Sequence, residues 1–113
     1  MESIESRCAK LLRSVVKVCR EYQTSLLAKR IIPQLIASSG SIGANYLEAT
    51  AALSKKDFVK CLKIARKEAR ECLIWIEGLK EIAYDKDKGL DPISQEIKEL
   101  SYILTSIISK NDK

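Results

Sequence analysis

The sequence predicts an all-α protein, an antiparallel up-down-up-down bundle of four helices. Its 113 residues are 46% hydrophobic but only 5% aromatic, with two prolines and four glycines, a composition that favours packed helices over a turn-rich sandwich. Apolar residues also recur at alternating steps of three and four, the period of one helix face. We expect one domain over residues 1–113. Its predicted helices are residues 3–22, 26–53, 54–83 and 92–109.

Residues 3–22 carry the first of these stripes. Its members are Ile4, Cys8, Leu11, Val15, Val18 and Tyr22, which a helix places on one face. A separate face carries basic side chains: Lys10, Arg13, Lys17 and Arg20. The polar residues 23–25 then predict a turn before the second helix.

The second predicted helix, residues 26–53, has no charged residue from Ile31 to Leu47. Its many polar and small residues exclude a membrane span, so we expect no membrane contact. Pro33 predicts either a kink or a later start. Gly40 and Gly43 belong to a run of small residues against which another helix is expected to pack closely. With so few solvated positions, this helix is expected to be buried by its own bundle and by another subunit.

Residues 54–83 show the longest periodicity. Ser54 and Asp57 are expected to cap the helix start, since a hydroxyl and a carboxylate there accept from free amides. The seam comprises Phe58, Leu62, Ala65, Ala69, Cys72, Ile76, Leu79 and Ala83. The opposite face is a basic ridge of Lys56, Lys60, Lys63, Lys67 and Arg70. Residues 55–70 alone carry a net charge of +5, equal to that of the whole chain.

The second half of this helix is apolar nearly all round, from Cys72 to Ile76. A single bundle buries one stripe, so the surplus around Trp75 indicates oligomerisation. The alternative is that Trp75 broadens the core of its own subunit.

Residues 84–91 read as a polar loop, and Asp91-Pro92 as a cap followed by a first-turn proline. The last helix is expected to bury Ile93, Ile97, Leu100, Leu104 and Ile107, and the tail of residues 110–113 is expected to fray.

The side-chain inventory argues against catalysis, cofactors and metals. The chain has no histidine, the usual general base and zinc co-ligand, and no glycine-rich phosphate loop or GxSxG motif. Its four cysteines form no CxxC pair and are expected to be reduced, small core residues. With no apolar run in the first ten residues, we expect a cytoplasmic protein.

Four segments carry a resemblance to a known family: residues 42–49, 54–58, 65–71 and 75–77. Over roughly residues 35–82 the chain resembles the bacterial four-helix-bundle proteins named after open reading frames in 23S rRNA intervening sequences. The resemblance implies a left-handed antiparallel bundle that assembles as a ring-shaped homopentamer. A related branch, the accessory protein of diversity-generating retroelements, is similar in fold, binds nucleic acid and partners a reverse transcriptase, which would be a partner here if the chain is of that branch.

Asn45, Tyr46 and Glu48 fall within the matching run. Asn45 and Glu48 stand one turn apart, and we interpret them as a structural polar clip at an interface rather than an active site. Arg66 or Arg70 is expected to supply the partner of Glu48.

Two functions remain from this inventory. The first is sequence-tolerant binding of RNA or DNA by the two basic ridges, which an oligomer would repeat, although a charged face is more commonly just solvated. The second is an oligomeric scaffold without nucleic-acid binding.

Overall fold

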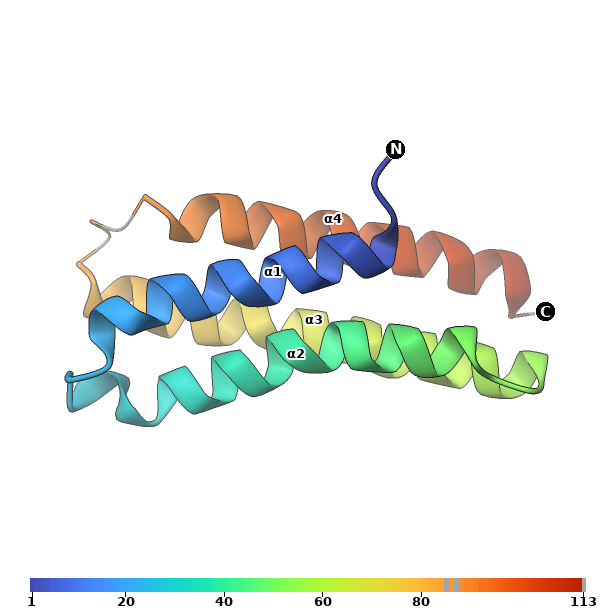
Figure 1. Ribbon diagram of the computed structural model, residues 1–113, viewed down its shortest axis with the longest axis horizontal. Helices are drawn as coiled ribbons and strands as arrows, with labels where there is room; N and C mark the ends of the chain where they lie inside the picture. The colour runs from blue at the N-terminus through green and yellow to red at the C-terminus, as the bar shows by residue number, and fades with distance from the viewer. Residues whose placement is uncertain (85, 87, 113) are drawn as a thin grey trace.

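Four α-helices lie side by side in the computed structural model, which describes residues 1–84, 86 and 88–112 (Figure 1). They are α1 (Ile4–Cys19), α2 (Ile31–Thr50), α3 (Lys55–Ile82) and α4 (Leu90–Asn111). α1 packs against α2 and α4, and α3 packs against the same two helices. The connections between successive helices lie at alternate ends of a body measuring 45 × 25 × 20 Å. The predicted all-α four-helix bundle is therefore confirmed.

The ends of the first two helices differ from prediction. α1 stops at Cys19, and Arg20–Tyr22 tighten into the 3-10 turn η1. The predicted start of the second helix at residue 26 is wrong, because Leu27–Lys29 form a separate 3-10 turn, η2, and α2 begins at Ile31. Pro33 thus lies in the first turn of α2, where a missing N–H costs no helical hydrogen bond. Of the two effects predicted for Pro33, the later start of the second helix is therefore correct.

The second helix also ends before its predicted limit. α2 stops at Thr50, although Leu53 fits its apolar period. The Leu53 side chain is fully exposed, so no packing holds that last predicted turn in a helix.

The third helix begins as predicted. The Ser54 hydroxyl accepts a hydrogen bond from the Asp57 amide at 3.1 Å, and α3 runs to Ile82. The predicted cap of the fourth helix is wrong, because Gly89 holds the N-cap position and Asp91 already lies in the first turn.

The predicted fraying at the chain's end is wrong for residues 110 and 111, which continue α4. An ion pair made by Asp112 ties this end of the helix to α3. Lys113, together with Asp85 and Asp87 of the predicted loop, lies outside the described residues.

The core follows the predicted stripes. In α3 every seam residue except Phe58, which is half-buried, is buried. In α4 the last buried position is Ile108, with Ile107 half-buried beside it. Leu35 and Ile42 of α2 face this core and are at most 1% exposed.

Close helix contacts depend on glycines. A Cβ atom at Gly43 of α2 would lie 3.0 Å from the Cβ of Cys8 on α1, closer than ordinary carbon contacts. At Gly40 the nearest atom, Cδ1 of Leu12, would be 3.8 Å away. A Cβ at Gly78 of α3 would lie 2.8 Å from Cδ1 of Ile31. The close approach expected from the small residues of α2 is thus observed at Gly43, whereas the contact at Gly78 was not predicted.

The two buried serines of α2 each bond to a carbonyl of their own helix. Ser38 donates to the Gln34 carbonyl at 2.9 Å, and Ser39 donates to the Ile36 carbonyl at 3.1 Å. Among the described residues, no buried side-chain nitrogen or oxygen lacks a hydrogen-bond partner. One polar contact crosses between α2 and α3, where the Ser38 Oγ lies 3.1 Å from Sγ of Cys72.

The cysteines are free thiols, as expected. Cys8, Cys19 and Cys72 are buried, and Cys61 is half-buried. Burial raises the pKa of each of the three buried thiols to about 11, because a thiolate is poorly solvated there. These residues serve as small apolar core groups.

Candidate nucleic-acid interface

A basic groove runs along the N-terminal half of α3, where the end of α4 lies beside it. Its volume is about 770 Å³. The residues that line this α3 groove are Lys55, Lys56, Val59, Lys60, Lys63, Ile64, Lys67, Asn111 and Asp112. Val59 is buried and Ile64 half-buried, so apolar groups lie beneath a rim of exposed ammonium groups.

The helical period explains this arrangement. Lys56, Lys60, Lys63 and Lys67 recur at steps of four, three and four, which a helix places along one line. Every lysine in the groove is exposed. Among the described residues, Lys55, Lys56, Lys60 and Lys67 have no carboxylate within ion-pair distance. The groove thus concentrates uncompensated positive charge.

Lys63 is the exception within the groove. Its Nζ lies 2.7 Å from Oδ2 of Asp112, at the end of α4. Both side chains are about half exposed, so the pair is a weak, solvent-screened contact. It nevertheless places a carboxylate directly among the lysines.

Four of the five predicted ridge residues on α3 therefore line one groove. The fifth, Arg70, is exposed but is not part of the lining. Sequence reasoning missed Lys55, Asn111 and Asp112 as groove residues. Lys55 adjoins the ridge in sequence and could have been included, whereas the two α4 residues become neighbours of α3 only through the fold.

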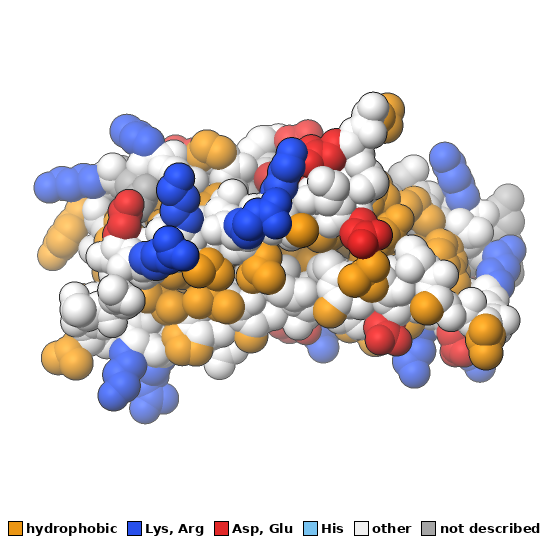
Figure 2. All heavy atoms as spheres, viewed as in Figure 1, with side chains coloured by type: hydrophobic (Ala, Val, Ile, Leu, Met, Phe, Trp, Pro, Cys, Tyr) orange, Lys and Arg blue, Asp and Glu red, His pale blue; other side chains and the backbone are white. Residues whose placement is uncertain are grey.

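The basic ridge on α1 is a separate surface. Lys10, Arg13, Lys17 and Arg20 are all exposed, and Figure 2 shows basic side chains standing out over α1 on the front face. Because α1 and α3 lie across the bundle from each other, the two ridges do not merge. Lys10 is also partly neutralised by Glu2, whose Oε2 lies 2.6 Å from its Nζ.

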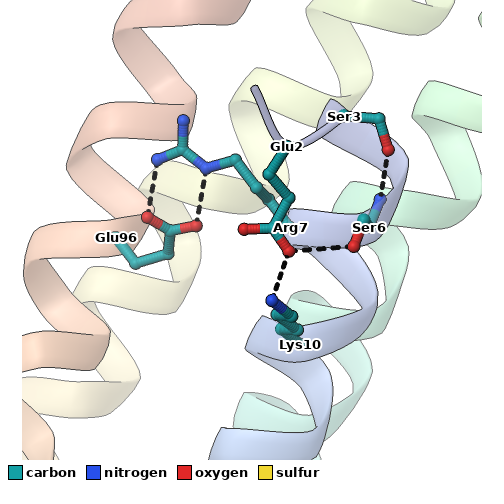
Figure 3. A network of polar contacts seen from close by, with 6 residues as sticks. All are labelled: Glu2, Ser3, Ser6, Arg7, Lys10 and Glu96. Carbon is teal, nitrogen blue, oxygen red and sulfur yellow. Dashed lines mark hydrogen bonds and ion pairs between the residues drawn. The ribbon is translucent and has the colours of Figure 1, made fainter.

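A polar network fixes the start of α1 and joins it to α4 (Figure 3). Arg7 donates from Nε and Nη2 to the two carboxylate oxygens of Glu96, at 2.9 and 2.6 Å. This bidentate pair raises the pKa of Arg7, since the carboxylate stabilises the charged guanidinium. Glu2 accepts from Lys10 and Ser6, and these bonds lower the pKa of the Glu2 carboxyl. The network has a structural role.

The predicted polar clip is not formed within the chain. Glu48 is exposed, and Asn45 donates to the Ser41 carbonyl one turn earlier at 2.8 Å. Arg66 instead faces α4, where it donates to the Thr105 hydroxyl at 3.4 Å. Among the described residues, neither Arg66 nor Arg70 makes an ion pair with Glu48, so the predicted pairing is wrong: Glu48 keeps its solvation on the outer face of α2.

Apolar side chains remain on the outer surface. Tyr46 and Trp75 are partly buried and pack against the core, which favours the interpretation that Trp75 broadens the core of its own subunit. Ile74 beside it is 67% exposed, and Leu47 of α2 is 46% exposed. The surface in front of α2 shows mainly apolar and uncharged atoms along its middle (Figure 2).

Among the residues that the structure describes, no group of three or more Cys, Asp or Glu side chains is placed to hold a metal ion. Of the helices in that part of the chain, none is both long and apolar enough to cross a membrane.

These features define an all-α four-helix bundle with a lysine-lined groove at one end. The model of the 23S rRNA-intervening sequence protein family matches residues 3–106, and the chain belongs to this family. It is also similar to a crystal structure from Bacteroides thetaiotaomicron, a protein of unknown function from the S23 ribosomal protein family. That similarity has 29% identity and a TM-score of 0.85, and covers 94% of this chain and 98% of the other. No curated protein matches the sequence.

Proposed function

We propose that this protein is a non-catalytic nucleic-acid-binding bundle that contacts phosphates through the α3 groove. The observation that carries the proposal is the line of exposed lysines in the groove, of which only Lys63 has a carboxylate partner among the described residues. Lysine ammonium groups contact phosphates as point charges without reading bases. Binding should therefore be sequence-tolerant and weaken steeply with salt.

Charge reversal in the groove tests this function. The triple substitution Lys60→Glu, Lys63→Glu and Lys67→Glu replaces three groove cations with anions. We expect oligonucleotide binding, followed by fluorescence anisotropy at low salt, to be abolished. All three side chains are exposed, so the helix should persist, and circular dichroism checks this.

A matched control separates the groove from overall charge. Lys86→Glu, Lys88→Glu and Lys98→Glu change the net charge equally, at exposed positions that do not line the groove. We expect this variant to retain most of its affinity. If the groove variant binds as well as the wild type, or both triples lose binding equally, the proposed site is refuted.

We further propose self-assembly of an antiparallel, left-handed bundle into a ring-shaped homopentamer. Exposed Leu47 and Ile74 support a subunit contact formed by α2 and the second half of α3. Light scattering coupled to size exclusion tests the assembly: a monomer at micromolar concentration contradicts it. An oligomer that retains no nucleic acid at low salt would instead favour a scaffold, the second candidate function.

A further inference from the structure

The α3 groove has two features that a plain basic surface lacks. Its floor is apolar, formed by buried Val59 and half-buried Ile64. A carboxylate, Asp112, already lies among the lysines, 2.7 Å from Nζ of Lys63. A polyanion that enters the groove must cover these apolar side chains and displace Asp112 from Lys63.

Building on the nucleic-acid binding proposed above, we propose that the α3 groove takes a single strand, and that Asp112 holds the position of one strand phosphate until the strand displaces it. A duplex keeps its bases stacked inside and presents sugars and phosphates outward, so it leaves an apolar floor uncovered. The unpaired bases of a single strand expose apolar faces that can pack there.

The lysine spacing fits one backbone. Lys67 lies eleven residues after Lys56 on α3, so the four lysines extend over about 16 Å at the rise of an α-helix. The line runs between Val59 and Ile64, which lie about 140° apart around the helix axis, so a strand whose phosphates follow the lysines places its bases against Val59 on one side or Ile64 on the other. No aromatic side chain lines the groove among the described residues, so the bases meet aliphatic groups and sequence preference is weak.

Asp112 competes with the strand for Lys63. A carboxylate and a phosphate oxygen both accept from the same ammonium group, so the strand gains this contact only by breaking the ion pair. Exposed ion pairs of this kind are weak. Removing the carboxylate should therefore tighten strand binding about two- to fivefold and steepen the salt dependence by about 0.7 in the log–log slope, the value for one single-strand phosphate.

The test compares Asp112→Asn with Asp91→Asn on the full chain. Both substitutions remove one negative charge from α4, but Asp91 lies at its opposite end, about 30 Å away, paired with Lys80 at 3.1 Å. That separation exceeds the screening length at physiological salt. The probe is a fluorescein-labelled oligothymidylate, titrated between about 50 and 200 mM salt.

We expect Asp112→Asn to bind the strand more tightly and Asp91→Asn to match the wild type. Equal tightening by both variants, or unchanged binding by Asp112→Asn, overturns the role of Asp112. In competition, a single strand should displace the probe better than a duplex of the same length, and a duplex that competes as well or better overturns the single-strand assignment. Polyglutamate that competes equally at matched charge would show recognition of charge alone and overturn it too.

Failure of this inference is distinguishable from failure of the proposed function. If the wild type binds no oligonucleotide, the nucleic-acid function itself is refuted. If the groove triple variant loses binding while Asp112→Asn behaves like the wild type, the function stands and only the displacement of Asp112 is refuted.

Discussion

The contact between Gly43 and Cys8 predicts an unusual result for a glycine-to-alanine substitution. In a helix interior, alanine is more favourable than glycine by about 1 kcal/mol. Gly40→Ala should stabilise the protein by this amount, because its new Cβ would be 3.8 Å from a Leu12 methyl, an ordinary contact distance. Gly43→Ala should not, because its Cβ would be 3.0 Å from the Cβ of Cys8.

The cost at Gly43 follows from which atom is approached. The Cβ of Cys8 is fixed to the α1 backbone and cannot rotate away, so relief requires α1 and α2 to move apart. Overpacking of this kind costs about 1–3 kcal/mol. After the gain in helix propensity is subtracted from this cost, Gly43→Ala should leave the free energy of unfolding unchanged or lower it by up to about 2 kcal/mol.

Urea unfolding followed by circular dichroism measures both variants, at two protein concentrations so that any effect of assembly is visible. A double-mutant cycle adds the control: Cys8→Ala keeps the Cβ and should not rescue Gly43→Ala, whereas Cys8→Gly removes it and should. If Gly43→Ala is as stabilising as Gly40→Ala, the close approach of the two helices is refuted.

Two further predictions follow from side-chain contacts. Arg7→Ala should lower the free energy of unfolding by about 1–3 kcal/mol, since it leaves Glu96, whose side chain is only 29% exposed, without its bidentate partner; Arg7→Lys should recover part of the loss because it restores charge but not the fork. Comparable stability of Arg7→Ala and wild type in urea contradicts this. The buried thiols predict a decline in stability from about pH 9 to 11, because Cys8, Cys19 and Cys72 keep their protons up to a pKa of about 11 while the unfolded thiols lose theirs at the ordinary thiol pKa of 9.0. A thiol-reactive chromophore should modify half-buried Cys61 before these three, and simultaneous reaction of all four in the folded protein would argue against their burial.

Much of the fold could be predicted because each helix repeats one physical rule. Leu62, Ala69 and Ile76 share a face of any α-helix, and burying that face largely determines how the helix packs. Helix ends were less predictable. Leu53 matches the apolar period of α2 but is exposed, since periodicity reports which face is apolar and not whether a partner reaches it.

The candidate site could be predicted only in part. The lysine line on α3 is local and could be read from spacing. The groove also needs the end of α4, and Asp112 is 49 residues from Lys63, a separation that no local pattern bridges. The expected partner of Glu48 failed for the same reason, because helix spacing does not specify which helix Arg66 faces.

The insertion of Ile31 against Gly78 has a consequence for slippage of α2 along α3. The buried serines of α2 bond to their own backbone, and Ser38 also reaches α3, where its Oγ lies 3.1 Å from Sγ of Cys72. Shape adds a second constraint on the register. A slide of one heptad would bring Ile31 opposite Glu71, whose side chain fills the space that Gly78 leaves open. In the other direction it would carry Ile31 beyond the end of α3 at Ile82. The missing side chain at Gly78 and the contact of Ser38 with Cys72 thus favour a single alignment for two helices whose seams would otherwise permit several.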